Sequence, residues 1–599
     1  MDIHELQKIV HKTRDHRRTQ TLPKYSPAER DTLIKKYHPD HRESAYRPIK
    51  FGPNTGDRTV RELASLLEGE SPVPADLDLT PAYTTDVLVV GGGGAGCAAT
   101  LHAHANGAKV LLATKLRLAD SNTVMAQGGI QVAITNEDSP VQHFLDTLKG
   151  GHMKNDHQLL KVMVEEGPAV AKWLLNLGVL FDRDADGNLH VKKGGGSSKP
   201  RLLTCSDYTG LEIMRVLKDE VLNQKIQVLE FCTTVELLSD GQGACSGAVL
   251  RDLDNKRSVV VAAKTVILAT GGIGRLHIQG FPTSNHYGAT GDGLALAYRM
   301  GAMLLQVDTF QYHPSGAVFP EQLIGALVTE GIRSEGGHLV NAKGERFVNE
   351  LDTRDVVSSS IIRECEEGRG IRTMSGRIGV WLDTPLLEVE QGPGTVAKHF
   401  PAMVKQYQRF GIDISKDPVL IYPTLHYQNG GVQIDVNSES NVKNLFVAGE
   451  ASGGLHGRNR LMGNSLLDLM VFGKQAESTA AARATSMPQG QLTLNHLAHF
   501  RTEARKHGAS ADVTSPVLFP AYAKKNDKML KKAANFVLGR SSASTNLPST
   551  PLRPNSRRPR YGKGRVPRAE NWSWPVRGWE GEITRWDWAG AMIAFLSIL

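Results

Sequence analysis

A glycine-rich turn between two apolar segments is the feature that most limits how this chain can fold. Residues 86–90 (DVLVV) are apolar without alternation, which predicts a parallel strand covered on both faces. The glycines of 91–96 follow, then an alanine-rich helix that ends before Gly107, and a second apolar strand at 109–113. This order of strand, turn, helix and strand predicts an α/β fold with a parallel sheet.

The spacing of Gly91, Gly93 and Gly96 matches the fingerprint of Rossmann-like dinucleotide-binding domains. The first glycine permits the tight turn, the second lets a pyrophosphate approach the backbone, and the third lets the helix pack on the strand. The alternative is a glycine-rich turn without a ligand. The second strand ends in Thr114-Lys115 rather than in the usual ribose-binding carboxylate. We expect Thr114 to replace that carboxylate; Lys115 as a 2′-phosphate ligand is the weaker interpretation.

Composition excludes several classes of protein. Hydrophobic residues make up 40% of the chain and charged residues 22%, which is typical of a globular protein. The five cysteines show no C-x-x-C spacing, which argues against a metal site in this chain and favours a reducing compartment. No apolar run reaches the ~18–20 residues of a membrane span, and the N terminus lacks a secretory pattern. We therefore expect a cytoplasmic protein without an integral membrane span.

The glycine turn is the first of a series of motifs. In chain order the series is DVLVVGGGGAG (86–96), SNTVMAQGGI (121–130), VILATGG (266–272), TGDGLALA (290–297), FQYHPSG (310–316), VTEGIRSEGG (328–337), TRDVVSS (353–359), PTLHYQNGG (423–431) and VAGEASGGLHGRNRLMGNSLLD (447–468). Over about residues 84–485 the chain resembles the flavoprotein subunits of succinate dehydrogenase and fumarate reductase, and the related L-aspartate oxidases. The resemblance implies a Rossmann-like FAD-binding domain with an inserted capping α+β domain.

The resemblance implies FAD as the cofactor. The contacts that it implies are Gly91, Gly93, Gly96, Thr114, Gln127, Gly128, Gly129, Asp292, Glu450, Ser465 and Leu466. Glu450 follows an apolar strand and suits a ribityl hydroxyl. Ser465 and Leu466 stand where a helix is expected to begin, so their N–H groups can bind the flavin carbonyls.

One position departs from the membrane-bound relatives, which attach FAD covalently to a histidine in a Ser-His-Thr context. The matching residues here are Ser121-Asn122-Thr123, and asparagine cannot form that bond. We therefore predict noncovalent FAD. Loss of the covalent link generally means a lower flavin potential, which favours fumarate reduction or oxidation by O₂ over succinate oxidation by quinone.

The resemblance also assigns a site for a small dicarboxylate such as fumarate or succinate. Arg460 and His426 would bind one carboxylate, and His313 and Thr329 the other. A guanidinium group suits this role because it can donate two parallel hydrogen bonds. A hydride would pass between flavin N5 and one substrate carbon.

In the relatives the accompanying proton comes from an arginine, which corresponds to Arg354. Glu330 and Arg333 would supply that arginine with protons. Alone, a histidine is more often a structural residue and an arginine a salt-bridged one. The matching motifs are what favour catalytic roles for Arg354, Glu330 and Arg333.

The 599 residues exceed a single core, so we expect several domains. The predicted divisions are an N-terminal extension (1–83), a FAD-binding domain in two parts (84–310 and 421–485), a capping domain (311–420), a short helical region (486–539) and a basic, Trp-rich, disordered tail (540–599). The extension has a capping-box spacing at 26–29 and an amphipathic segment at 59–69, but no residues that suggest chemistry.

Several alternatives remain open at this stage. The nearest is an L-aspartate oxidase, which needs a carboxylate beside the substrate ammonium. Another is a noncatalytic subunit whose flavin relays electrons. The resemblance implies a separate electron carrier, an iron–sulfur subunit or another type, and thus a cytoplasmic location that includes the inner face of a membrane. The basic tail is most simply solvated, so nucleic acid is not an expected partner.

Overall fold

The computed structural model describes residues 3–509 and 513–518. The predicted tail at 540–599 lies outside these residues, as does the part of the predicted helical region beyond 518. Within the described residues, no helix is long and apolar enough to cross a membrane.

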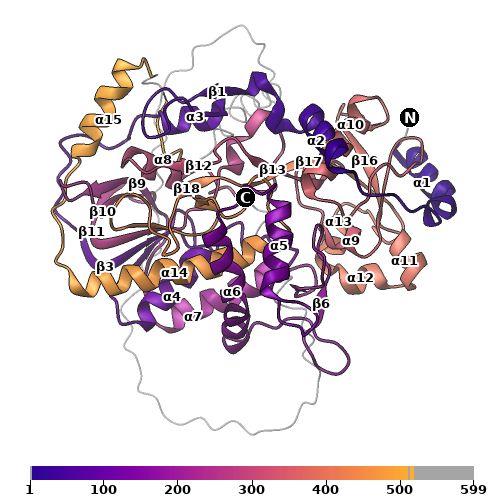
Figure 1. The fold of residues 1–599 in the computed structure, drawn as a ribbon, viewed down its shortest axis with the longest axis horizontal. Helices are drawn as coiled ribbons and strands as arrows, with labels where there is room; N and C mark the ends of the chain where they lie inside the picture. Colours follow the sequence, from indigo (N-terminus) through magenta and orange to yellow (C-terminus); the bar gives the residue numbers. More distant parts are fainter. Residues whose placement is uncertain (1–2, 510–512, 519–599) are drawn as a thin grey trace, which may run out of the picture. The chain divides into compact units, whose positions relative to one another are not determined.

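A seven-stranded sheet carries the glycine turn (Figure 1). Its order is β8 (Gln227–Leu229), β4 (Val110–Ala113), β3 (Tyr83–Val90), β11 (Arg257–Leu268), β10 (Cys245–Asp252) and β9 (Cys232–Ser239), with β19 (Leu445–Val447) beside the end of β11. The strands β8, β4, β3, β11 and β19 pair in parallel, whereas β10 and β9 are antiparallel. The predicted parallel α/β sheet is therefore present.

Helices rich in small residues pack closely beside this sheet. The contacts join α4 (Gly94–Ala105), α7 (Thr209–Asn223) and α14 (Asn464–Ser486), which lie together below the sheet in Figure 1. A Cβ atom at Gly473 of α14 would lie 2.8 Å from the backbone oxygen of Ala95 in α4. The close approach of these two helices therefore requires glycine at that position.

A second, antiparallel sheet follows from the middle of the chain. Its order is β13 (Phe310–Ala317), β17 (Val419–Gln428), β16 (Ile378–Asp383) and β14 (His338–Val340), and β15 (Ile371–Arg372) pairs with β16. Helix α10 (Arg354–Glu366) packs against it. The capping-domain limits predicted at 311 and 420 lie near the first residues of β13 and β17, and they stay predictions.

Smaller elements complete the described structure. The helices are α1 (Ile3–Arg18), α2 (Pro27–Tyr37), α3 (Arg61–Leu67), α5 (Pro140–Gly150), α6 (His157–Asn176), α8 (Asp292–Arg299), α9 (Gly331–Ser334), α11 (Leu386–Gln391), α12 (Thr395–His399), α13 (Pro401–Gln408) and α15 (Asn495–Lys506). The strands are β1 (Tyr46–Pro48), β2 (Arg58–Val60), β5 (Ile130–Gln131), β6 (Val191–Lys192), β7 (Leu202–Leu203), β12 (Leu304–Leu305), β18 (Gly431–Gln433) and β20 (Ser452–Gly453).

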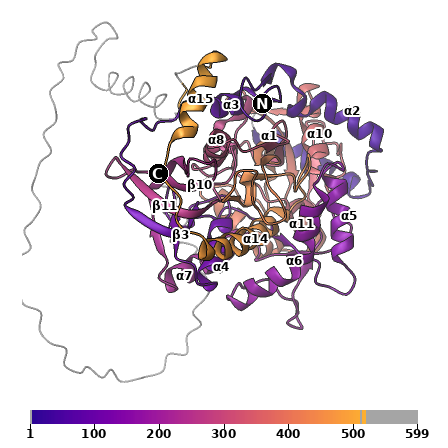
Figure 2. The ribbon, with the colours of Figure 1, turned by 60° about the vertical axis from the view of Figure 1, so that its left-hand side comes forward.

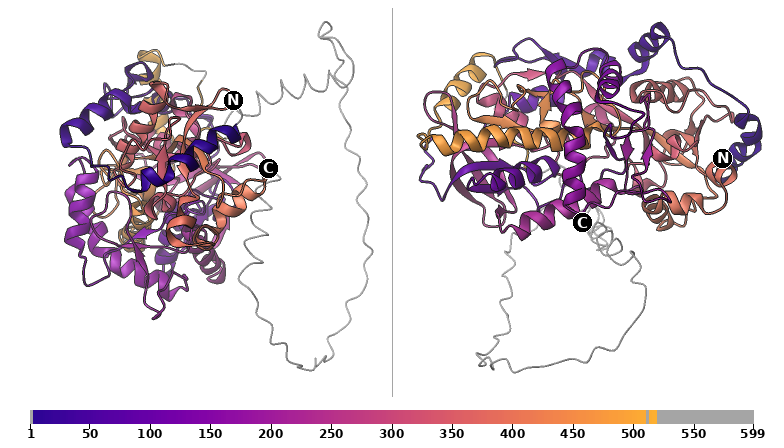
Figure 3. Two further views of the ribbon diagram at one scale, coloured as in Figure 1. Left: turned by 90° about the vertical axis from the view of Figure 1, so that its right-hand side faces the viewer. Right: turned by 60° about the horizontal axis from the view of Figure 1, so that its bottom comes forward.

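The N-terminal extension begins against the second sheet. Helix α1 packs on β16, where Arg14 and Arg17 lie 2.6 and 2.8 Å from the two carboxylate oxygens of Asp383. Helix α2 packs on α10, and the predicted capping box between Ser26 and Glu29 opens it. Both helices are drawn in indigo in the left panel of Figure 3.

The same extension then crosses to the first sheet. The Tyr298 hydroxyl of α8 donates to the Phe51 carbonyl (2.7 Å), and the Asn54 amide donates to the Leu304 carbonyl (2.9 Å). Helix α15 lies beside this part of the extension in Figure 2, and the rings of Phe51 and Phe500 are 5.0 Å apart. One continuous segment therefore contacts the elements of both sheets.

Replacing Asp383 with alanine tests whether α1 is anchored by its buried charges. The Arg17 side chain is fully buried, so the substitution leaves a guanidinium group without a carboxylate. We expect the free energy of unfolding of the protein to fall by about 3–5 kcal/mol in denaturant titration.

Asp413→Ala is the matched control, because the Asp413–Lys416 pair is exposed and contributes at most about 1 kcal/mol. An equal decrease in the free energy of unfolding in the two variants would show that the buried Asp383 ion pairs contribute no more to stability than an exposed pair does.

Candidate active site

A pocket opens along the edge of the first sheet where its parallel strands end. Residues that follow β3, β4 and β19 line it, among them Gly91, Thr114 and Ala448. Ligands of parallel α/β sheets bind at this carboxyl edge. The same pocket reaches His426 and Arg460, so one cavity joins the glycine turn to two of the four predicted substrate residues.

The glycine turn is shaped by two close backbone contacts. Gly91 has φ +119°, and a Cβ atom there would lie 2.2 Å from the backbone oxygen of Ala269. A Cβ atom at Gly96 would lie 1.8 Å from the Gly91 oxygen. The N-cap residue of α4, Gly93, lines the pocket and has no side chain, and the N–H group of Gly94 donates to the Thr123 hydroxyl (3.2 Å). The N–H groups of a helix start fit the pyrophosphate of a dinucleotide.

The predicted cofactor contacts divide into two groups. Those that line the pocket are Gly91, Gly93, Thr114, Asp292, Glu450, Ser465 and Leu466. Those that do not are Gly96, Gln127, Gly128 and Gly129. Helix α14 begins at Asn464 without a side-chain cap, so Ser465 and Leu466 stand in its first turn, as the sequence indicated.

Lys115 is held by protein oxygens at one end of the pocket. Its ammonium group lies 3.1 Å from the Asp292 carboxylate, 2.8 Å from the Thr290 hydroxyl and 2.8 Å from the Val517 carbonyl. Its charge is therefore balanced by Asp292. This arrangement does not favour the 2′-phosphate interpretation.

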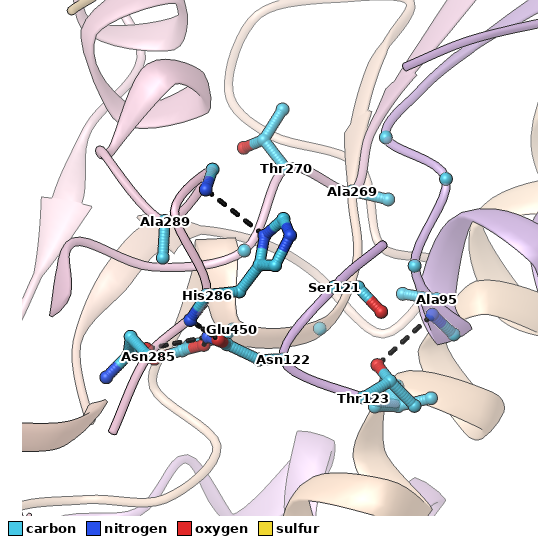
Figure 4. Close-up of a pocket in the computed structure, with 18 of the residues that line it drawn as sticks. Ala95, Ser121, Asn122, Thr123, Ala269, Thr270, Asn285, His286, Ala289 and Glu450 are labelled. Carbon is cyan, nitrogen blue, oxygen red and sulfur yellow. Dashed lines mark hydrogen bonds between the residues drawn. The ribbon is translucent and has the colours of Figure 1, made fainter. Parts of the chain in front are cut away.

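Asn122 and Glu450 form a polar cluster in the wall of the pocket (Figure 4). The Asn122 amide donates to Asn285 (2.6 Å) and to Glu450 (3.3 Å), and its oxygen accepts from the backbone of His286 (2.6 Å). Glu450 also accepts from the backbone N–H of Gln428 (3.0 Å). Burial raises the pKa of Glu450 to about 6.

The residues predicted to handle the substrate and its proton converge beside this pocket. Arg354, at the start of α10, donates to Glu330 across 2.8 Å. Arg333 lies 3.3 Å from the same carboxylate oxygen, and His313 of β13 lies 3.7 Å from it. The ring of His426, in β17, is centred 5.1 Å from that of His313. Thr329, which directly precedes Glu330, is 2% exposed.

Gln311 links the two arginines that the sequence assigned to different roles. Its side-chain oxygen accepts from Arg354 (2.9 Å) and from Arg460 (3.0 Å). Sequence reasoning did not single out Gln311. Its position two residues before His313 in the motif FQYHPSG was the available signal.

Burial and positive charge set the protonation states in this cluster. Burial lowers the pKa of His313 well below its ordinary value, and neighbouring arginines act in the same direction. Burial lowers the pKa of Arg460 to about 10. Burial alone would raise the pKa of Glu330, but Arg354 and Arg333 hold it below its ordinary value. The cluster thus holds a carboxylate, neutral histidine and an excess of guanidinium groups.

Three donors in the cluster have no hydrogen-bond partner among the described residues. They are His313 Nε2, Arg460 Nε and Arg333 Nη2, all buried, and the last lies 3.3 Å from the Glu330 carboxylate. The aromatic ring of Tyr427 lies 4.3 Å from the guanidinium carbon of Arg460, and the Ser284 hydroxyl is 2.7 Å from His426 Nδ1. Sequence reasoning also missed Tyr427 and Ser284. Tyr427 stands in the same motif as His426, and only His426 was assigned a role there. Ser284 is far from His426 in the sequence and meets it only in the folded structure. The arrangement suits an anionic ligand.

Comparison with known proteins places this geometry among flavoproteins. Residues 86–466 match the family model described as FAD binding domain. The chain is 40% identical over 414 residues to one subunit of the fumarate reductase (CoM/CoB) of Methanothermobacter marburgensis, in a match that covers 67% of this chain and 74% of that protein. It is 36% identical over 418 residues to L-aspartate oxidase 2 of Ralstonia nicotianae, in a match that covers 68% and 74%.

Solved structures give the same result. A mutant of quinol fumarate reductase FrdA from E. coli superimposes with a TM-score of 0.64 and 31% sequence identity. The match covers 71% of this chain and 74% of that one.

Gly96→Ala tests the fit of the glycine turn. The added methyl group would overlap the Gly91 carbonyl, and relieving such overpacking costs about 1–3 kcal/mol or more. We expect bound flavin per mole of purified protein to fall several-fold.

The matched control is Gly167→Ala in α6, where the nearest atoms to a Cβ would be Leu467 methyl groups 3.5 Å away. Full flavin content in the Gly96 variant would contradict the close contact.

His313 also predicts a dependence of stability on pH. Its folded-state pKa lies well below the ordinary 6.5, so the unfolded chain binds this proton first. The free energy of unfolding is therefore highest above pH 6.5. As the pH is lowered below 6.5, it decreases by about 1.4 kcal/mol per pH unit for one histidine. Unfolding titrations between pH 5 and 7, roughly one unit either side of the transition, should show a shallower slope for His313→Asn. The exposed His190→Asn variant should retain the wild-type slope.

Proposed function

This chain belongs to the FAD-binding family of fumarate reductase and succinate dehydrogenase-type oxidoreductases, and from that premise we propose that it interconverts fumarate and succinate or a similar small dicarboxylate. The observation that carries the proposal is the buried excess of positive charge. Arg333, Arg354 and Arg460 are 2%, 8% and 3% exposed, and Glu330 is the carboxylate that Arg333 and Arg354 share. An anion compensates such a site best.

The donors of this cluster suit two carboxylates. One end of the substrate is assigned to Arg460 and His426, which line the pocket together with Ser465. The other is assigned to His313 and Thr329. The Arg354 and Arg460 guanidinium groups both donate to the side-chain oxygen of Gln311. A carboxylate oxygen of the substrate can take the place of that acceptor.

Proton supply is assigned to Arg354, Glu330 and Arg333. Bound FAD supplies the two-electron chemistry. Arg354 donates a proton to the substrate carbon, and the 2.8 Å contact with Glu330 allows that proton to be replaced at once. Arg333, which lies 3.3 Å from the same Glu330 oxygen, continues the path. Arginine can act as an acid only because this replacement keeps its deprotonated state short-lived.

We propose that FAD is held without a covalent bond. Asn122 stands at the position of the attaching histidine, and both of its polar groups already bond to protein atoms. The cofactor is then retained by the first turn of α4, by Glu450 and by the first turn of α14.

L-aspartate oxidase is the second candidate, supported by the relative from Ralstonia nicotianae. That reaction needs a carboxylate free to receive the substrate ammonium. Glu330 is engaged by Arg354, and Glu450 by Gln428 and Asn122. This engagement favours the dicarboxylate reaction, and the experiment below separates the two.

We further propose a separate electron carrier, an iron–sulfur subunit or another type, because the Methanothermobacter relative is named as one subunit of its enzyme. The five cysteines, all within the described residues, form no disulfide, which supports a reducing compartment. We therefore propose that the protein works in the cytoplasm or at the inner face of a membrane.

The test is anaerobic reoxidation of the flavin. The protein should release FAD into acid, and after reduction with dithionite its flavin should be reoxidised by fumarate. Arg354→Ala should slow that step by about 10²–10⁴-fold, the usual contribution of a positioned proton donor. The exposed Arg215→Ala variant should react as the wild type does.

Reduction of the oxidised flavin by L-aspartate without any response to fumarate would establish the oxidase instead. A flavin that responds to neither compound would indicate an electron-relay subunit.

A further inference from the structure

Asp355 is a buried carboxylate that directly follows the proposed proton donor in the sequence. It follows Arg354 at the start of α10 and is 5% exposed. One of its oxygens accepts from the Asn459 amide (3.3 Å) and from the backbone of Val356 (3.0 Å). The other lies 2.6 Å from His152 Nε2. Asp355 therefore ties three separate segments of the chain together.

These contacts close a ring around the two substrate arginines. Asn459 directly precedes Arg460, and its side-chain oxygen accepts from Gln311 (2.9 Å). Gln311 in turn accepts from both Arg354 and Arg460. The relative position of the two guanidinium groups is thus fixed on one side by Gln311 and on the other by the Asp355–Asn459 contact.

His152 is the outer member of this arrangement and lies outside every motif of the sequence. It sits in the turn after α5, and its side chain is 23% exposed. Its φ is +57°, a left-handed conformation that is costly for a residue other than glycine. Strain of this kind persists where surrounding contacts hold it, and it marks candidate functional positions.

We propose that His152 is a positioning residue, which aligns Arg354 with Arg460 for a dicarboxylate by holding Asp355. The proposal rests on the function assigned above. Without the His152 donor, the buried carboxylate loses one of its side-chain partners and the first turn of α10 is less constrained. Misplacement of a reacting group by about 1 Å can cost on the order of 10²-fold in rate.

His152→Ala and His152→Gln separate the donor from the backbone. Both side chains keep a Cβ atom, so they carry a similar cost in the left-handed conformation, but only glutamine can still donate to Asp355. We expect kcat/KM for fumarate to fall by about 10–100-fold in the alanine variant, and the glutamine variant to recover most of it. Flavin content and reoxidation by O₂, which needs neither arginine, should stay at the wild-type level in both. The exposed His190→Ala variant is the control.

A second measurement needs no substrate. Amide hydrogen exchange at residues 354–358 should be faster in His152→Ala than in the wild type, and should return toward the wild-type rate in His152→Gln. Unchanged exchange in the alanine variant would overturn the proposal whatever the substrate is. Equal losses of fumarate turnover in both variants would also overturn it, because the donor would then not be the cause. If the wild type itself does not react with fumarate, the assigned function fails, and the exchange experiment still decides the role of His152.

Discussion

Positive charge held away from water is the constraint on which the rest of this structure depends. Desolvating one ion costs several kcal/mol, and the site buries three guanidinium groups, two of which pair with Glu330. Neutral groups offset part of that cost. The side-chain oxygen of Gln311 accepts hydrogen bonds from Arg354 and Arg460, and the ring of Tyr427 lies against the Arg460 guanidinium group. The compensation is incomplete, and the remaining charge makes the site selective for an anion rather than for a neutral carbonyl compound.

Each of the two sheets contributes a different part of this site. The carboxyl edge of the parallel sheet provides backbone N–H groups, which bind phosphate without introducing more charge. The antiparallel sheet provides rigid neighbouring strands, and these place His313 beside His426 although the two are far apart in sequence. Helix α10 packs on that second sheet and delivers Arg354 at its first residue. A site on strands and helix termini is held more firmly than one on loops, which suits the acid role that we propose for Arg354.

Local patterns in the sequence predicted the elements well and their long-range contacts poorly. The strand expected at 86–90 is the end of β3, and the amphipathic segment at 59–69 contains α3. The motifs located His313, Glu330, Arg354, His426 and Arg460, which the structure brings together. Gln311 and Ser284 escaped because their roles arise from partners on other elements. The anchoring of the N-terminal extension was missed for the same reason: nothing near Arg17 in the sequence indicates a carboxylate 366 residues away. Residues 540–599 stay a prediction.

That separation has a consequence for how the chain matures on the ribosome. Arg17 is synthesised before Asp383, which follows 366 residues later. At about 5–20 residues per second, α1 waits roughly 20–70 s for its counter-charge. During that interval the helix has no docking surface, so nascent chains need either a chaperone or a soluble, charged helix. With arginine, lysine and histidine along most of its turns, α1 has the second property. The basic residues of α1 thus keep the helix soluble during synthesis, and Arg14 and Arg17 pair with Asp383 once the protein has folded.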